Sequence, residues 1–396
     1  MNVDLPSNAV TGDLKVHFTP DMNTDRLVFR LWPNGPALAS VGAHLDVSGV
    51  TVDGAAAPTS LANATTLVIP GNRAAGQGVD IAMNWRLVLP GAVNDRVARI
   101  GDAVRLGSFF PILPWESGVG WDLEPPPPQF AEASTAPTAD FDASVTTNPG
   151  DLGVLASGVP DRPGHWTATA VRDFALSTGR FTIATAVAHV PDPVNVTVGA
   201  SAGTGVSPQQ FAAKAVNVLQ QHSARFGPYA WSTYTLAITP SLGGGIEYPT
   251  FVMQGPGTIG RTTSHELGHE WFYSLVGNNQ GRDPWLDEGL ATYAEGRYEG
   301  TINGFKTSSI PAGAAGHLGE PLTYWDGNHS LYNQGVYIQG AKALASLGDL
   351  NLVDCGLRVY VARNAYRIAR PADLVAAMST VFPQAPQTLA GFGVHS

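Results

Sequence analysis

A short histidine-containing motif constrains this chain more than any other feature. It reads HELGH at residues 265–269, and eighteen residues separate His269 from Glu288. On a helix, residues four positions apart lie on one face, so His265 and His269 can offer two imidazole nitrogens to one metal ion. Glu288, on a following helix, would supply a carboxylate oxygen as the third ligand. Two histidines, one glutamate and an open position are typical of a catalytic zinc site.

The residues around this motif favour a metal site over a chance pattern on a solvated helix face. The segment 262–264, TTS, is typical of a helix start, and the motif continues into an apolar face. A second amphipathic helix is expected to carry Glu288. A closed structural zinc site would need a fourth protein ligand, usually cysteine, and the chain has only Cys355. Phe272 and Leu275 stand where metzincins have a glycine and a third histidine, which excludes that subtype.

Glu266 is the candidate general base. It is not a ligand in this arrangement, but it lies close enough to the metal to hold a water molecule. It is also the only residue of the motif that is spaced to take a proton from that water. Peptide hydrolysis would further need an oxyanion donor, such as a phenol or an imidazole, and a strand edge that aligns the substrate backbone.

The composition excludes several other functions. Apolar residues make up 44% of the 396 residues, which is enough for substantial cores, and a chain of this length is expected to form two domains. The net charge is −10, with 22 basic residues and no basic run, so nucleic acid is not expected as a partner. No stretch approaches 18 apolar residues, so no transmembrane segment is expected. The oligomeric state cannot be read from these features.

The hydrophobic pattern changes near residue 200. Before it, apolar and polar residues alternate in short runs between Gly, Pro, Asn and Asp clusters, as antiparallel strands require; the runs include residues 14–18, 27–31, 85–89 and 181–186. Ser207-Pro208 and Gly227 are typical of the two ends of a helix, and a strand at 234–238 follows. Beyond residue 330 the pattern is helical. We therefore expect an α+β fold, with a β domain at 1–200 and a helix-rich catalytic domain at 201–396.

Three segments of the chain resemble the aminopeptidase-N-like family of gluzincins, the HExxH-x18-E zinc metallopeptidases. The first is the metal motif together with WLDEGLATYAE at 285–295. The second is GGIEY at 244–248, which is similar to the family's GxMEN strand edge. The third is VYIQGAK at 336–342, which is similar to the VYEKGA helix start. The β half agrees, because residues 28–34, 141–145 and 172–176 are similar to the family's N-terminal saddle domain.

The resemblance implies a short two-domain member of that family. Its N-terminal antiparallel β saddle or sandwich domain would precede a thermolysin-like, helix-rich catalytic domain with one Zn²⁺ per chain. His265, His269 and Glu288 would bind the zinc, and Glu266 would be the general base and proton shuttle. Glu295 matches a carboxylate that steadies a ligand histidine.

The resemblance also assigns the substrate contacts. Tyr337 matches the tyrosine that donates to the oxyanion, with Tyr332 as the rival candidate on the same segment. Glu247 matches the glutamate that holds the free α-amine of the substrate. The glycines at 244–245 would let the peptide backbone approach the strand edge. Tyr248 replaces the asparagine that ends GxMEN, which is expected to alter how the amine or the first side chain is held.

Two parts of the family pattern are missing from this sequence. They are the PCxDEP-like segment near a second amine anchor and the large C-terminal helical domain that restricts the site to chain ends. The leading hypothesis is therefore a zinc peptidase, with removal of N-terminal residues favoured because Glu247 is in place. A zinc endopeptidase with an open cleft is the alternative. A catalytically silent binding protein of the same fold and a zinc hydrolase for non-peptide substrates such as epoxides also use these residues.

The cellular location is weakly constrained. Residues 1–6 lack the basic and apolar regions of a signal peptide, although a secreted protein whose signal had been removed would have the same sequence. The Gly- and Pro-rich, cysteine-poor composition favours an extracellular or bacterial envelope protein over a cytoplasmic one. Cys355 by itself says little about the redox compartment.

Overall fold

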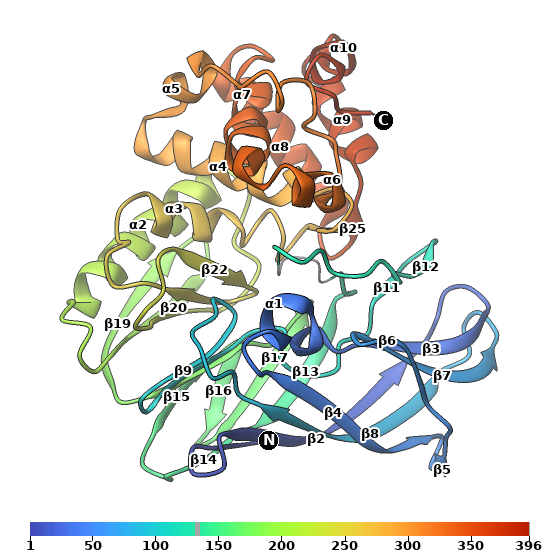
Figure 1. Cartoon of the computed structure of the whole chain (residues 1–396). Helices are drawn as coiled ribbons and strands as arrows, with labels where there is room; N and C mark the ends of the chain where they lie inside the picture. Colours follow the sequence, from blue (N-terminus) through green and yellow to red (C-terminus); the bar gives the residue numbers. More distant parts are fainter. Residues whose placement is uncertain (131–134, 396) are drawn as a thin grey trace. The chain divides into compact units, whose positions relative to one another are not determined.

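The structure, a computed structural model, describes residues 1–130 and 135–395 of the chain. It divides into two compact units, one made of residues 1–156 and 160–180 and the other of residues 157–159 and 181–396. The first unit consists mainly of strands, and the second combines a five-stranded sheet with most of the helices (Figure 1). This arrangement confirms the expected α+β fold class, with strands first and helices later.

The two units divide at residue 180, whereas the sequence pattern places the boundary at 200. The difference lies in β19 (Phe181–His189) and β20 (Pro193–Ser201), which form a hairpin in the second unit. Strand β20 pairs in parallel with β21 (Thr233–Ile238), which explains why the hairpin belongs to that unit. Alternation of apolar and polar residues correctly marks 181–186 as a strand. It does not specify which sheet the strand joins.

The first unit is built from sheets of mostly antiparallel strands that follow the alternation in the sequence. Its largest sheet has the strand order β14-β1-β2-β8-β4-β5. In β8, the residues Val79, Ile81, Met83, Trp85 and Leu87 are buried and the intervening ones face outward. The other sheets have the orders β3-β7-β6, β15-β18-β10-β9, β13-β17-β16 and β11-β12.

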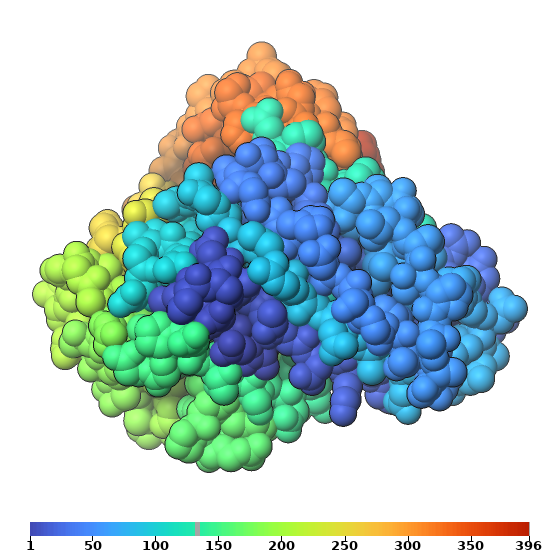
Figure 2. Space-filling model, turned by 60° about the horizontal axis from the view of Figure 1, so that its bottom comes forward, coloured from blue at the N-terminus to red at the C-terminus, as the bar shows by residue number. Residues whose placement is uncertain are grey.

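The elements of the first unit have the following bounds: β1 Asn2–Asp4, β2 Ala9–Phe18, β3 Thr24–Arg30, the 3₁₀ turn η1 Trp32–Asn34, α1 Pro36–Ala39, β4 His44–Val52, β5 Ala55–Ala56, β6 Ser60–Asn63, β7 Thr66–Arg73, β8 Val79–Val88, β9 Val97–Ile100, β10 Ala103–Leu106, β11 Trp115–Glu116, β12 Gly120–Trp121, β13 Ala139–Ser144, β14 Thr146–Asn148, β15 Gly153–Ala156, β16 Val159–Arg162, β17 His165–Val171 and β18 Leu176–Gly179. Strand β1 pairs in parallel with β14, and Figure 2 shows the dark blue N-terminal residues at the surface next to green ones.

The second unit contains a five-stranded sheet of order β19-β20-β21-β23-β22. Strands β20, β21 and β23 (Phe251–Gln254) run parallel, and β22 (Gly245–Tyr248) pairs antiparallel with β23. In β21 and β23 every residue is buried, as expected for central strands covered on both faces. Strand β22 ends the order, so it pairs within this sheet on one side only.

The remaining elements of the second unit are helical apart from one short pair of strands. They are α2 Pro208–Phe226, α3 Arg261–Gly268, β24 Gly277–Asn278, α4 Trp285–Glu299, α5 Ile302–Thr307, α6 Leu322–Gly327, the 3₁₀ helix η2 His329–Leu331, the π-helix η3 Asn333–Ile338, α7 Gln339–Ala345, α8 Leu350–Asn364, β25 Ile368–Ala369, α9 Pro371–Ser379 and α10 Ala385–Ala390. No helix in residues 1–130 and 135–395 combines the length and the apolar character that a membrane span requires.

Helix α2 confirms the sequence prediction in its bounds. Ser207 is the N-cap residue, Pro208 is the first helical residue, and Gly227 ends the helix with φ at 114°. The Ser207 hydroxyl donates to the side chain of Gln209 at 2.9 Å, so it makes no cap hydrogen bond with the helix backbone. The segment 262–264 likewise does not cap α3, which begins one residue before it and has no side-chain cap.

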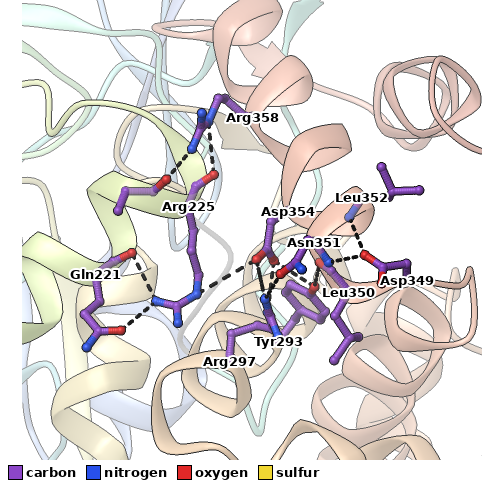
Figure 3. A network of polar contacts seen from close by, with 11 residues as sticks. Gln221, Arg225, Tyr293, Arg297, Asp349, Leu350, Asn351, Leu352, Asp354 and Arg358 are labelled. Atoms are coloured by element: carbon purple, nitrogen blue, oxygen red, sulfur yellow. Dashed lines mark hydrogen bonds and ion pairs between the residues drawn. The ribbon is translucent and has the colours of Figure 1, made fainter.

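A network of hydrogen bonds and ion pairs connects α4 with α2 and α8 (Figure 3). Asp354 of α8 accepts hydrogen bonds from the Tyr293 hydroxyl at 2.9 Å and from the Arg297 guanidinium at 2.6 to 3.1 Å. Arg225 of α2 lies 3.9 Å from the same carboxylate, and Arg358 of α8 donates to backbone carbonyls at the end of α2. One carboxylate thus joins three helices, among them the helix that carries Glu288.

Candidate metal centre and active site

Three side chains from two neighbouring helices converge on one point in the second unit. The Nε2 atom of His265 lies 3.1 Å from Glu288 Oε2, and the Nε2 atom of His269 lies 3.4 Å from the same oxygen. The two Nε2 atoms are 3.1 Å apart. His265 lies in α3, His269 directly follows it and Glu288 lies in α4. The structure therefore brings together all three predicted zinc ligands.

The helices α3 and α4 approach closely because a glycine lies between them. A β-carbon at Gly268 would lie 3.2 Å from the Cα atom of Ala291 in α4, which is tighter than ordinary contact. Gly268 thus lets the backbone that carries the two histidines reach the helix that carries Glu288. Nearly every residue of α4 up to Gly296 is buried, so this helix is a rigid support for its ligand.

Partners on the far side of each imidazole fix the ring nitrogen that faces the convergence point. His269 Nδ1 lies 3.2 Å from the backbone oxygen of Phe272, which can only accept a hydrogen bond. His265 Nδ1 lies 3.4 Å from Glu295 Oε2. Each Nδ1–H can therefore donate on the far side of its ring, which leaves both Nε2 atoms, facing Glu288, available to a metal ion. Glu295 occupies the position expected of a carboxylate that steadies a ligand histidine, and Arg261 contacts its other oxygen.

This donor set fits a zinc ion. Two imidazole nitrogens and one carboxylate oxygen face one another, and each is a ligand atom that zinc accepts. The ligand atoms lie within 4.8 Å of one another, which is compatible with binding to one ion.

The electrostatics of the cluster also favour a cation. Burial alone would lower the pKa of His265 and His269, but neighbouring carboxylates outweigh it and raise the pKa of His269 to about 9 and that of His265 well above its usual value. Burial alone would raise the pKa of Glu288, but the two imidazoles lower it. The cluster is rich in negative charge, and a metal ion can supply the positive charge that the imidazoles otherwise carry.

Glu266 lies beside the convergence point without being part of it. It is 5% exposed, and its Oε2 atom has no hydrogen-bond partner in the described part of the chain. Burial raises its pKa to about 7, against the lowering effect of His265 and His269. A buried carboxylate with a free oxygen and a raised pKa is suited to accept a proton from a water molecule. Gly245 of β22 packs against it so closely that a β-carbon at position 245 would overlap the Glu266 side chain.

Glu247 approaches the same point from the sheet. One oxygen of Glu247, one of Glu266 and a ring nitrogen of His269 lie within 4.8 Å of one another. Glu247 is 4% exposed and lies on β22, the strand that ends the sheet order. Gly244 lies directly before this strand, and no atom lies within 4 Å of the space that a β-carbon there would fill. The predicted strand edge is therefore next to the metal ligands, with room for a substrate backbone at Gly244.

Tyr248, which was expected to alter how the substrate amine or first side chain is held, does not present its side chain to the site. Tyr248 is fully buried in the core. Side chains alternate between the two faces of a strand, and positions 245 and 247 face Glu266. Tyr248 therefore faces away from the site. Applied to the GxMEN-like segment, the two-residue period of a strand could have indicated this from the sequence.

Tyr337 lies against the ring of His265. Its ring stacks on the His265 ring, with 5.7 Å between centroids and 15° between the planes. The side chain is half-buried, so it can meet a substrate. The rival Tyr332 is 7% exposed and contacts the Tyr337 ring edge-on at 5.6 Å. The geometry favours Tyr337 as the residue that reaches the reacting group, with Tyr332 supporting it.

Two residues that sequence reasoning missed line the same region. Gln280 Nε2 lies 3.1 Å from Asp287 Oδ2 and 3.5 Å from Glu247 Oε1, so one amide group lies between two buried carboxylates. Burial and the neighbouring Glu288 raise the pKa of Asp287 to about 7. Gln280 comes from an irregular segment without periodicity, which is why no pattern points to it. For Asp287, the only signal in the sequence is its position directly before Glu288.

Comparisons with known proteins show which fold this chain shares. A crystal structure of a mutant M1 zinc metallopeptidase from Deinococcus radiodurans, bound to a Tyr-Ser-Ala substrate, matches 100% of this chain and 93% of that chain, with a TM-score of 0.74 and 19% identity. A structure described as a two-domain M1 zinc metallopeptidase mutant bound to L-arginine matches with a TM-score of 0.69, also at 19% identity. At this identity the likeness establishes a shared fold.

Curated relatives match over a shorter segment. Leukotriene A-4 hydrolase of Xenopus laevis is 37% identical over 86 residues, and aminopeptidase B of Rattus norvegicus is 37% identical over 95 residues. Leucine aminopeptidase 2 of Aspergillus niger is 36% identical over 85 residues. These matches cover 19–22% of this chain and 14–15% of the relatives. No family model matches the chain.

The resemblance to aminopeptidase-N-like gluzincins is confirmed in two ways. The whole chain has the fold of the two-domain M1 zinc metallopeptidases, and one segment has significant sequence similarity to curated members.

Proposed function

We propose that this chain is a zinc-dependent peptidase that removes N-terminal residues from peptides. The convergence of His265 Nε2, His269 Nε2 and Glu288 Oε2 on one point, with Glu266 and Glu247 beside it, carries this proposal. The fold shared with M1 zinc metallopeptidases and the similarity to aminopeptidase B and leucine aminopeptidase 2 support it.

His265, His269 and Glu288 would hold the zinc ion. When bound, zinc supplies Lewis acidity, which polarises a peptide carbonyl and lowers the pKa of water. Glu266 takes the proton of the attacking water and later passes it to the leaving amine. Burial in this site makes Glu266 a stronger base than an exposed glutamate, because its pKa is raised.

Tyr337 stabilises the negative charge that develops on the carbonyl oxygen. Its half-buried phenol lies over the His265 ring, so the hydroxyl can approach a substrate bound at the ligands. A hydroxyl that donates to the oxyanion in the transition state, and less well in the ground state, lowers the barrier.

Glu247 gives the site its preference for chain ends. Its buried carboxylate lies next to His269 and Glu266, so a peptide whose free ammonium group pairs with Glu247 has its first peptide bond close to the ligands. The main chain of an internal segment carries a neutral amide and no ammonium group at this point. Binding such a segment next to Glu247 would therefore be less favourable.

The test of this specificity compares one peptide with a free N-terminus and the same peptide N-acetylated. We expect release of the first residue from the free peptide and turnover of the acetylated peptide at least about a hundredfold lower, since the acetylated peptide lacks the ammonium group that forms a charge-assisted hydrogen bond with Glu247. Cleavage of the acetylated peptide at an internal bond with comparable kcat/KM would identify an endopeptidase and contradict the proposal.

We also propose a location outside the cytoplasm, which the Gly- and Pro-rich, cysteine-poor composition supports. Peptide substrates are the expected partners, and nucleic acid is not, because basic residues are few and not clustered in the sequence. Fractionation of cells that express the natural gene tests the location. Activity confined to the cytoplasmic fraction would reject it.

A further inference from the structure

Tyr337 lies on a turn of π-helix and not of α-helix. The π-helix η3 spans Asn333–Ile338, and α7 starts directly after it at Gln339. A π-turn is rare and carries one more residue than an α-turn, and such turns are frequent at functional sites. The direction of the Tyr337 side chain therefore depends on the contacts that keep this turn in its π-form.

Two contacts hold the turn. Gly335 packs against the indole of Trp325 so closely that a β-carbon at position 335 would overlap ring atoms Cη2 and Cζ3. Trp325 is fully buried, and its Nε1 donates to the carbonyl oxygen of Glu320 at 3.0 Å. The Gln339 side chain donates to the carbonyl oxygens of Gly335 and Ala314 at 3.0 and 2.9 Å. The indole and the amide thus fix the turn at its centre and at its end.

A row of aromatic rings extends the influence of Trp325 to the metal ligands. The Trp325 and Tyr332 rings lie 6.0 Å apart, the Tyr332 and Tyr337 rings 5.6 Å, and the Tyr337 and His265 rings 5.7 Å. The first two contacts are edge-on and the last is stacked, and both geometries are favourable for aromatic pairs. Trp325 therefore contacts both the backbone at Gly335, two residues before Tyr337, and the ring of Tyr332, which packs against Tyr337.

A second glycine contact fixes the distance between α7, which follows the π-turn, and α4. A β-carbon at Gly340 of α7 would lie 2.6 Å from the Cα atom of Gly289, the residue after the ligand Glu288. The backbones of α4 and α7 therefore cross in direct contact. With this crossing fixed, the π-turn alone decides how far Tyr337 extends over the His265 ring.

We propose that Trp325 and Gly335 are positioning residues for Tyr337. The indole packed against Gly335 keeps the turn in its π-form, and this form holds the Tyr337 phenol over the His265 ring. The inference rests on the proposed function, in which the Tyr337 hydroxyl donates to the developing oxyanion. Hydrogen bonds weaken steeply with misalignment, so a small shift of the turn lowers kcat without removing a catalytic group.

The test is a double-mutant cycle between Gly335→Ala and Tyr337→Phe. With Tyr337 present, we expect Gly335→Ala to lower kcat at least about tenfold, with KM within about threefold and zinc content unchanged. In the Tyr337→Phe background the same substitution should change kcat less than about twofold, because the hydroxyl that it misplaces is gone. Equal losses in both backgrounds, or a Gly335→Ala enzyme with normal kcat, would overturn the inference.

Two further variants keep the test decisive. Gly304→Ala is the matched control, because Gly304 is helical and no atom lies within 4 Å of its added β-carbon; its kcat should equal the wild-type value. If Gly335→Ala fails to fold, Trp325→Phe replaces it in the cycle, since phenylalanine lacks Cη2 and Cζ3 but adds no atom at the turn. The same pattern of losses is expected, and its absence would overturn the inference.

A crystal structure of Gly335→Ala gives a readout that does not depend on activity. The separation of the Tyr337 and His265 ring centroids should differ from 5.7 Å, and an unchanged ring position would contradict the inference. The proposed role of the Tyr337 hydroxyl and its positioning by Trp325 and Gly335 can also fail separately. Equal kcat values for wild-type and Tyr337→Phe would reject the proposed role of Tyr337, whereas the crystal structure tests the positioning alone.

Discussion

His265 Nδ1 lies 3.4 Å from Glu295 Oε2, on the side of the ring opposite the Nε2 atom that faces Glu288. Two carboxylates of α4 thus lie on opposite sides of one imidazole. Glu295 can accept a hydrogen bond from Nδ1–H, which leaves Nε2 available to a metal ion.

Replacing Glu295 with alanine should weaken zinc binding about 10- to 100-fold, because the His265 ring loses the acceptor that fixes its orientation. Competition with a chelator measures the dissociation constant. Arg261→Ala is the control, since Arg261 contacts Glu295 and not the histidine. If both variants bind zinc as tightly as the wild-type protein, Glu295 does not steady the ligand.

Gly245→Ala should lower kcat at least about tenfold while zinc remains bound. An added β-carbon would overlap the Glu266 side chain and displace the general base. Gly243→Ala is the matched control, two residues earlier on the same segment, where no atom lies within 4 Å of the added carbon. Steady-state kinetics and metal analysis of both proteins test this. Full activity of Gly245→Ala would show that the close packing has no catalytic consequence.

Asp354→Ala should reduce the free energy of unfolding by about 3 kcal/mol, because it leaves the guanidinium groups of Arg225 and Arg297 without their shared carboxylate. Denaturant titration measures the change. Asp349→Ala on the same helix removes a cap to Asn351 and Leu352 and should cost about 1 kcal/mol. Equal losses in the two variants would indicate that the network across the three helices adds nothing.

The stability of the protein should rise with pH between about 4 and 6.5 in part because of His222. This residue is fully buried, its Nε2 donates to the Ser264 carbonyl at 3.1 Å, and burial lowers its pKa to about 4. Between its folded pKa and the ordinary value near 6.5, the unfolded chain binds a proton that the folded chain does not bind. The stabilisation is therefore present above about pH 6.5 and is lost as the pH falls towards 4.

His222→Gln removes this titration and keeps an amide donor for Ser264. The difference in unfolding free energy between pH 4 and pH 6.5 should then be smaller than in the wild-type protein by about 3 kcal/mol. Urea titrations of both proteins at the two pH values measure it. The idea fails if both proteins lose the same stability on acidification.

Local patterns predict which residues converge at the candidate metal site. The four-residue spacing of His265 and His269 places both rings on one face of a helix, and the spacing to Glu288 lets a second helix complete the set. The signals for the two ends of α2 are also local, because proline and glycine restrict or free the backbone at their own positions. These features depend on residues close in the sequence, which explains why one sequence is sufficient to predict them.

Contacts between distant segments are harder to predict. The partner sheet of the 181–201 hairpin depends on β21, and the proximity of Gln280 to Glu247 depends on the path of an irregular segment. The π-turn under Tyr337 depends on Trp325, which comes from a separate short helix. Such relationships result from tertiary packing, and no periodicity of apolar residues records them.

Zinc binding and turnover of Glu266→Gln test whether this chain is a zinc peptidase with Glu266 as its base, because glutamine keeps the shape of the side chain and removes its basicity. We expect wild-type and variant proteins each to bind one zinc ion per chain, and the variant to hydrolyse a free-amine peptide roughly 10²–10⁴-fold more slowly. Wild-type turnover in zinc-loaded Glu266→Gln, or a wild-type protein that binds no zinc, would contradict this mechanism.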